Sequence, residues 1–117
     1  MSVPAIGSDS VFAVLNSALD GLTVRQNVIA DNIANVDTPG FRATSVDFET
    51  SLRSAIENGG RTAVSAKELP TDTPVGANGN NVDLRKETLA ATQTQFQYQL
   101  MTRAVSDRFA LIRTAAS

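Results

Sequence analysis

The stretch SVFAVLNSALDGLTVRQNVIADNIANV, residues 10–36, decides the fold. Its large apolar residues recur at alternating steps of three and four, and only Gln26 interrupts them. They are Phe12, Leu15, Leu19, Leu22, Ile29, Ile33 and Val36. A repeat of about 3.5 residues places them on one side of an α-helix, as in the seam of a coiled coil or helical bundle. We therefore predict one helix over residues 10–36, about 40 Å long.

A second amphipathic stretch covers residues 83–115, and it predicts a helix of about 50 Å. Its first stripe follows the same alternating step, through Leu84, Thr88, Ala91, Gln95, Tyr98, Thr102, Val105, Phe109 and Ile112. A second stripe lies beside it, formed by Leu89, Phe96, Leu100, Ala104, Leu111 and Ala115. Two adjacent stripes are more than one partner helix needs, so this helix is expected to contact further partners. We predict that these apolar residues of both helices are the seams of an assembly.

One segment of this second helix also suits a strand. Residues 93–99 read QTQFQYQ, a strict alternation of polar and aromatic residues. The helical stepping continues on both sides of it, which favours a helix over a strand. A helix with a break near Gln95 is the alternative.

Both helices are poor in charge. The first carries only Asp20, Arg25 and Asp31, and residues 88–102 of the second carry no charge. Solvated helix faces usually present charged residues. The positions outside the seams hold Asn, Gln, Thr, Ser and Ala, which hydrogen-bond or pack without burying a charge. The composition therefore favours helices covered on several sides by neighbouring subunits. An uncharged but solvated surface is the alternative interpretation.

The segment between the helices, residues 37–82, is rich in turn-forming residues, with Pro70, Pro74 and an Asn-Gly-Asn-Asn run at 78–81. A connection of this length is unusual in a compact domain, so we predict an extended, partly disordered middle that partners order. Residues 46–56 suit a short helix. The predicted fold is therefore a single, mainly α unit: a flexible start over residues 1–9 and an antiparallel helical pair or coiled coil joined by the loop-rich middle.

Composition excludes several functions. The 117 residues contain no Cys and no His, which rules out thiol nucleophiles, imidazole bases and the usual zinc sites. A net charge of −2 gives no electrostatic reason to bind nucleic acid. No uncharged apolar run is long enough for a transmembrane helix, and the first residues lack the pattern of a cleaved secretory signal. We expect no membrane insertion.

The remaining residues also give no active site. The acids Asp20 and Asp31 belong to a helix surface, whereas Asp47 and Glu49 belong to a solvated loop. Residues 78–83 lack the alternating acids and terminal Glu of a calcium loop, and a turn explains them. We predict no catalytic residue, metal, cofactor or small-molecule substrate, and therefore no enzyme.

The end of the first helix carries the most specific motif in the chain. Residues 32–41 are Asn32, Ile33, Ala34, Asn35, Val36, Asp37, Thr38, Pro39, Gly40 and Phe41. This run closely resembles the motif N-hydrophobic-A-N-x-x-T-P-G-aromatic of bacterial flagellar axial proteins of the rod and hook group. Physically, the asparagines are expected to bond backbone where the helix ends, Pro39 stops the helix, and Gly40 permits a positive φ.

Further residues make the chain look most like the proximal rod proteins of this group. They are Val46-Asp47-Phe48-Glu49, the second motif Gly79-Asn80-Asn81-Val82-Asp83, and Tyr98-Gln99. The run Leu84-Arg85-Lys86-Glu87 is more basic than the acidic continuation expected for that subtype. The resemblance fades between residues 53 and 77.

The resemblance implies a structural subunit of the flagellar basal-body rod in the periplasm, exported by the flagellar type III pathway without a cleaved signal. It implies polymerisation through the terminal helices, torque transmission and an export channel lined by the subunits. The implied partners are further copies, other rod proteins, and proteins of the membrane-ring and export-gate junction. A small helical chaperone or adaptor of flagellar export is the alternative, although it leaves the Thr-Pro-Gly-aromatic junction unexplained.

Overall fold

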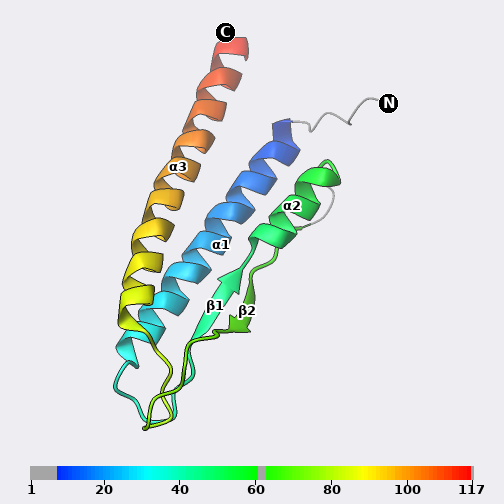
Figure 1. Cartoon of the computed structure of the whole chain (residues 1–117). Coiled ribbons are helices and arrows are strands. Elements are labelled where there is room, and N and C mark those ends of the chain that lie inside the picture. Colours follow the sequence, from blue (N-terminus) through cyan, green and yellow to red (C-terminus); the bar gives the residue numbers. More distant parts are fainter. Residues whose placement is uncertain (1–7, 61–62, 117) are drawn as a thin grey trace.

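The computed structural model describes residues 8–60 and 63–116. Its elements in chain order are α1 (Ser8–Ala34), β1 (Thr44–Asp47), α2 (Glu49–Glu57), β2 (Lys67–Pro70) and α3 (Leu84–Ala116). The long helices α1 and α3 lie side by side and antiparallel, and the three short elements lie along the other side of α1 (Figure 1). The predicted mainly α fold with two long, paired terminal helices is confirmed.

The subunit is elongated. Its radius of gyration is 17.7 Å, whereas a compact domain of this length has a value of about 13 Å. Helix α3 is continuous through residues 93–99, so the break near Gln95 does not occur. No helix in the described part of the chain is both long and apolar enough to cross a membrane. The flexible start predicted for residues 1–9 falls mostly on residues 1–7, outside the described part.

The middle segment differs from the extended, partly disordered connection predicted for it. Over the described residues 37–60 and 63–82 it contains α2 and an antiparallel sheet of β1 and β2, in which Thr44 pairs with Pro70 and Asp47 with Lys67. Helix α2 begins only at Glu49 because the preceding residues form β1. Burial of Val46 and Phe48 against α1 stabilises this segment, which turn composition alone does not reveal.

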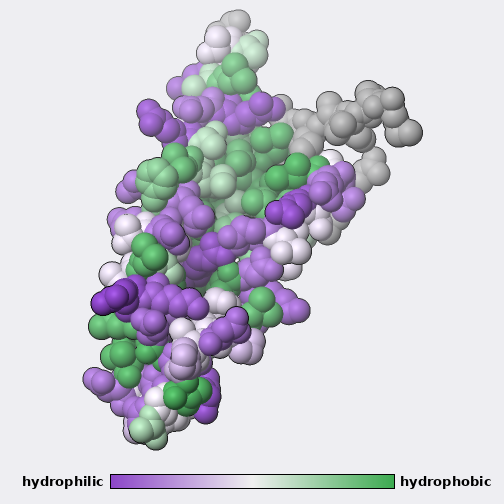
Figure 2. Space-filling view, viewed as in Figure 1, coloured by the Kyte–Doolittle hydropathy of each residue, from purple (hydrophilic) through white to green (hydrophobic). Residues whose placement is uncertain are grey.

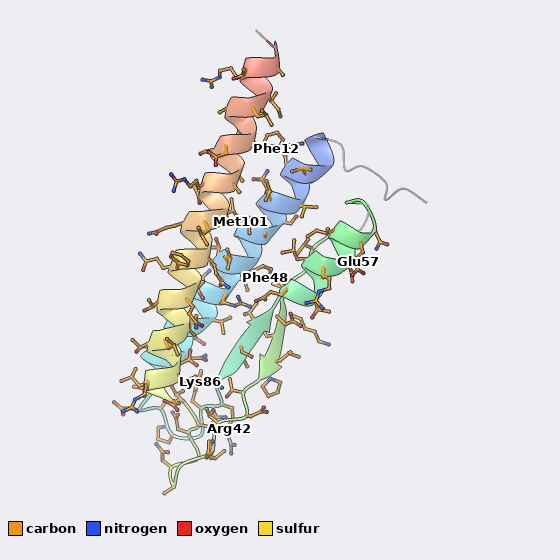
Figure 3. All side chains as sticks on the ribbon, turned by 45° about the horizontal axis from the view of Figure 1, so that its top comes forward. Phe12, Arg42, Phe48, Glu57, Lys86 and Met101 are labelled. Carbon is orange, nitrogen blue, oxygen red and sulfur yellow. The ribbon has the colours of Figure 1, made fainter. Side chains whose placement is uncertain are left out.

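The core lies between α1, the end of β1 and α3. Its fully buried members are Ala18, Leu22, Val46 and Phe48, and half-buried residues surround them: Val28, Leu52, Val64, Tyr98 and Met101. The ring of Phe48 lies where β1 meets α2, beside α1 (Figure 3). Gly21 of α1 permits this approach, since a Cβ added there would stand 2.7 Å from Cγ of Phe48. The core therefore couples the helical pair to the short elements.

Replacing Gly21 with alanine should lower the free energy of unfolding, by up to about 2 kcal/mol. The overlap with Phe48 costs about 1–3 kcal/mol, and the preference for alanine in a helix offsets about 1 kcal/mol of this. Urea unfolding measures the change, and Asn16→Ala on the exposed face of the same helix is the control. A Gly21→Ala protein as stable as the control would show that this contact is not tight.

Candidate functional site

The two sequence motifs, 32–41 and 79–83, meet at the end of the molecule where α1 stops and α3 starts. The side-chain amide of Asn80 donates hydrogen bonds of 2.8 Å to the carbonyl oxygens of Asn35 and Thr38. The Gly40 N–H donates to the Asn78 carbonyl at 2.9 Å. Gly40 and Gly79 have φ of 77° and 80°, and a Cβ on Gly79 would stand 3.3 Å from Cα of Gly40. Both glycines are therefore required by backbone conformation, and Gly79 also by the close approach of the two segments.

Inside the first motif, short-range hydrogen bonds shape the end of α1. The Asn35 amide donates to the Asp31 carbonyl at 2.8 Å, and its Oδ1 accepts from the Thr38 hydroxyl at 3.0 Å. Pro39 then follows, and it has no N–H with which to continue the helix. These contacts direct the chain from α1 into β1.

Asn81 extends the junction to the loop after β2. Its Oδ1 accepts the Ala43 N–H at 2.6 Å, and its backbone carbonyl accepts the Thr73 hydroxyl, also at 2.6 Å. Its own N–H donates to the Phe41 carbonyl at 3.3 Å. Val82 and Asp83 then lead into α3, where Asp83 Oδ1 accepts the Lys86 N–H at 3.1 Å. The second motif thus connects three segments that are distant in sequence.

The side-chain amide of Asn32 on α1 hydrogen-bonds to the backbone of β1, as the backbone of a neighbouring strand would. Its side chain, 1% exposed, donates to the Thr44 carbonyl at 2.8 Å and accepts the Thr44 N–H at 3.4 Å. The same amide donates to Oε1 of Glu87 on α3 at 3.1 Å. Ile33 and Ala34, the next motif residues, complete α1, with Ile33 half-buried and Ala34 exposed. Asn32 therefore joins α1, β1 and α3.

Replacing Asn80 with alanine should destabilise the junction by about 1–3 kcal/mol, since it removes a donor to the Asn35 and Thr38 carbonyls and the acceptor of the Val82 N–H. We expect a lower melting temperature, together with faster amide exchange at the Gly40 and Asn81 N–H groups. Thr92→Ala, on the exposed surface of α3, is the control. Unchanged exchange at both N–H groups would contradict the account of the junction.

Glu87 is the one strongly buried acid in the described part of the chain, at 5% exposure. Burial raises the pKa of its carboxyl group, although the Asn32 hydrogen bond and the Lys86 charge oppose the shift. A raised folded-state pKa favours the native state below the unfolded pKa, about 4.3. This contribution is lost as the pH rises through the folded pKa.

Glu87→Gln should therefore raise the melting temperature at pH 7, because an amide accepts the Asn32 hydrogen bond without burying a charge. The difference from the unsubstituted protein should shrink as the pH falls through the raised folded pKa of Glu87, and level off below about 4.3, where Glu87 is protonated in both states. Calorimetry from pH 3.5 to 7.5 measures this profile. A difference independent of pH, or a less stable variant at pH 7, would refute it.

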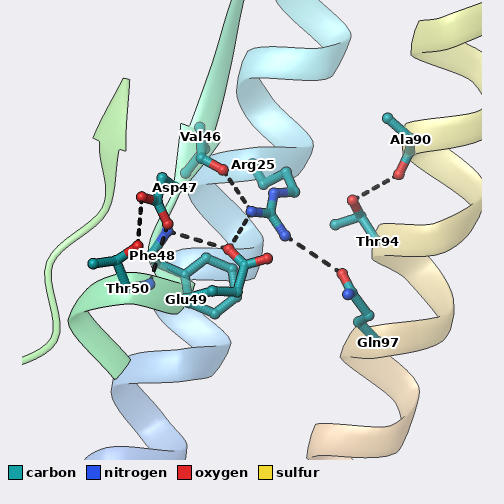
Figure 4. Close-up of polar contacts among 9 residues, drawn as sticks. All are labelled: Arg25, Val46, Asp47, Phe48, Glu49, Thr50, Ala90, Thr94 and Gln97. Carbon is teal, nitrogen blue, oxygen red and sulfur yellow. Dashed lines mark hydrogen bonds and ion pairs between the residues drawn. The ribbon is translucent and has the colours of Figure 1, made fainter. Parts of the chain in front are cut away.

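Arg25 forms a second connection, closer to the core. Its guanidinium donates to the Val46 carbonyl and to the Glu49 carboxylate, and it also reaches Gln97 on α3 at 3.5 Å (Figure 4). Its Cζ lies 4.7 Å from the centroid of the Phe48 ring. Partial burial disfavours the Glu49 carboxylate, but the hydrogen bond and charge of Arg25 outweigh this, so the pKa of Glu49 is lowered. The sequence interpretation treated Arg25 only as one of the few charges on the helix and missed this role.

The residues of the predicted α1 seam are all at least partly covered. Leu22 and Ile29 are buried, whereas Phe12, Leu15, Leu19 and Ile33 are half-buried. A further α1 stripe packs on the short elements, and it has the same alternating step: Val14, Ala18, Gly21, Arg25, Val28 and Asn32. This stripe was missed because small and polar residues occupy four of its six positions.

On α3 the covered residues form one stripe that only partly coincides with the predicted seams. They are Glu87, Ala91, Thr94, Tyr98, Met101, Val105, Arg108 and Ile112, with the half-buried Ala90 beside them. Leu84 and Phe109 of the predicted first stripe are exposed, although the Phe109 ring contacts that of Phe12 with centroids 4.6 Å apart. This stripe also follows the alternating step of three and four. It was not predicted because Glu87, Thr94 and Arg108 are not apolar.

The predicted second stripe of α3 lies on the side away from α1. Leu89, Phe96, Leu100 and Leu111 are each more than half exposed. We call these four residues the outer stripe. Hydrophobic residues are visible along the α3 side of the molecular surface, among hydrophilic ones (Figure 2). Exposed large apolar residues gathered on one face are typical of an interaction surface.

Among the described residues, no group of three or more His, Cys, Asp or Glu side chains is placed to bind a metal ion. The features that the described residues present are the junction, the Arg25 contacts and the outer stripe.

Comparison with known proteins identifies the class. A family model described as "Flagella basal body rod protein" matches residues 12–42, which cover most of α1 and the first motif. The chain is 33% identical to the flagellar basal body rod protein FlgB of Borreliella burgdorferi over 113 residues, 78% of this chain and 84% of that protein. It is 33% identical to FlgB of Bacillus subtilis, covering 86% and 88% of the two chains. For FlgB of Escherichia coli the identity is 30%, covering 84% and 86%.

These matches define a flagellar basal body rod protein. More particularly, the chain belongs to the FlgB family. The resemblance inferred from the two motifs is confirmed at this level.

Proposed function

We propose that the chain is a structural subunit of the bacterial flagellar basal-body rod, in its proximal part. The observation that carries the proposal is the relation to FlgB proteins over more than three quarters of the chain. A rod must be built from many subunits in contact, so each subunit requires surfaces that remain uncovered when it is alone.

The geometry supports a subunit of this kind. Helices α1 and α3 form a stiff, elongated pair, and the junction, Asn32 and Arg25 tie the short elements to it. Within the part of the chain that the structure describes, the outer stripe stays more than half exposed. In this proposal the covered residues of the predicted seams hold the subunit together, and the outer stripe contacts neighbouring subunits.

In this proposal the terminal helices of successive subunits pack around a central channel, transmit torque along the rod and line the path of exported proteins. The partners are further copies, other rod proteins, and proteins at the membrane-ring and export-gate junction. The location is the periplasmic part of the basal body, reached without a cleaved signal. The proposal involves no cofactor, nucleic acid or small-molecule substrate.

Fractionation tests the proposal. An epitope-tagged chain that restores swimming to a strain lacking the gene should co-purify with detergent-extracted basal bodies. In a strain unable to build basal bodies, the same protein should be missing from that fraction. A chain that stays in the soluble fraction of the complemented, swimming strain would contradict the proposal and favour the export chaperone.

A further inference from the structure

A shallow groove runs between α1 and α3 in the part of the pair nearer the junction. Its volume is about 290 Å³, and its lining is free of charged residues: Gln26, Ile29, Ala30, Ile33, Ala91 and Gln95. Ala30 is exposed, whereas Ile33 and Ala91 are half-buried. Small side chains on both helices leave this hollow, which has an apolar floor and amide groups at its edges.

Phe96 of the outer stripe lies at nearly the same height but on a different face. It is 61% exposed, and it follows Gln95, which lines the groove. Successive helix residues are separated by a turn of about 100° and a rise of about 1.5 Å. Phe96 therefore points away from the groove of its own subunit, and one chain carries an apolar projection and an apolar hollow that it cannot join by itself.

The charges around these two surfaces suit contact between two copies. No charged residue occurs in residues 88–102, so placing Phe96 in the groove buries no ionic group. The exposed charged residues of α1 between residues 11 and 34 are both acids, Asp20 and Asp31. Around the outer stripe, α3 presents the exposed bases Arg85 and Arg103 and one exposed acid, Asp107, so the bases outnumber the acid. The acidic α1 of one copy and the net positive face of α3 of the next attract each other in a head-to-tail contact.

We propose that Phe96 of one copy inserts into the α1–α3 groove of a second copy. The contact rests on the proposed function and specifies one interface within it. Because it joins two different surfaces, repetition produces an open array rather than a closed dimer unless the rotation between copies closes a ring. Phe96 is then the anchor of the contact, and Ala30 keeps the groove open.

Directional cross-linking tests this contact, because the chain contains no cysteine. Full-length Thr92→Cys carries a thiol one turn from Phe96, and full-length Ala34→Cys carries one a turn from Ala30, so both surfaces stay intact. The two proteins are mixed at high concentration with a short bis-maleimide. We expect a mixed cross-linked dimer, and its yield should fall at least tenfold when Phe96→Ala is added to the Thr92→Cys protein.

The same Phe96→Ala change in the Ala34→Cys protein should leave the mixed dimer unchanged, since that copy contributes only its groove. Ile56→Cys, on the exposed side of α2, replaces Thr92→Cys in the control mixture. Circular dichroism verifies that the Phe96→Ala proteins are folded. The inference would be overturned if Phe96→Ala lowered the yield of mixed dimer equally in either cysteine protein, or in neither. It would also be overturned if the control mixture gave the same yield as the Thr92→Cys mixture. If the chain nevertheless co-purifies with basal bodies, the proposed function stands and only this interface fails.

Discussion

Phe48→Ala should lower the free energy of unfolding by about 3–5 kcal/mol, the usual cost of removing a buried aromatic side chain. The Phe48 ring is 3% exposed. It contacts the α1 backbone at Gly21 and lies beneath the Arg25 guanidinium. Its loss leaves a cavity at the point where the helical pair meets the short elements. Urea unfolding followed by far-ultraviolet circular dichroism measures the change.

Ile56→Ala is the matched control for this substitution. Ile56 lies on α2 and is 49% exposed, so its truncation should change stability by less than about 1 kcal/mol. If Phe48→Ala were no more damaging than Ile56→Ala, the core between α1 and the short elements would contribute little, and the middle segment would be the loose connection that its composition suggests.

Introducing charge into the outer stripe should abolish swimming without unfolding the subunit. The double variant Leu89→Asp and Leu100→Asp changes two side chains that are more than half exposed, so the free energy of unfolding should change by less than about 1 kcal/mol. In the assembled rod the same two carboxylates would be buried without partners, at a cost of several kcal/mol each. The measurement is swimming in soft agar by a strain that carries only the variant gene.

Val24→Asp and Ile56→Asp, each made singly, are the controls for surface charge. Both residues are exposed and lie outside the outer stripe. We expect the Ile56→Asp strain to swim, because α2 lies on the far side of α1 from α3 (Figure 1). Swimming by the Val24→Asp strain measures whether the exposed face of α1 tolerates a charge. Normal swimming by the outer-stripe double variant, with the protein present at its usual level, would count against assembly through this face.

Much of the fold could be predicted from local pattern. A step of three and four is a property of consecutive residues, so it located both long helices to within two residues of the observed bounds. At the end of α1 the difference has a simple cause. The Asn35 N–H donates to the carbonyls of both Asp31 and Asn32, so the last predicted residues form a tighter turn instead of another helical turn.

The middle segment could not be predicted in the same way. Its strands have four residues each, and Thr44 pairs with Pro70 across 26 positions. A strand so short carries little periodicity, and non-local pairing leaves no trace in a window of neighbouring residues. Turn-forming asparagines were interpreted as signs of disorder, whereas Asn80 and Asn81 hold the junction together through hydrogen bonds to backbone.

The candidate site was predicted in its parts but not in its connections. Both motifs were recognised from sequence, yet only the structure shows that Asn80 of one motif binds Asn35 of the other. Arg25 and Glu87 were missed because a charge on an amphipathic helix ordinarily faces solvent. Their partners, Glu49 and Asn32, lie 24 and 55 positions away in sequence.

The central claim, that the chain is a rod subunit whose α3 face is covered by its neighbours, is tested most directly by a density map of basal bodies assembled with this protein. The account predicts that in such a map the outer stripe of each copy, with Phe96 at its centre, is in contact with another protein chain along the proximal rod. A map in which this face of α3 borders solvent, or in which the chain is absent from the rod, would contradict it.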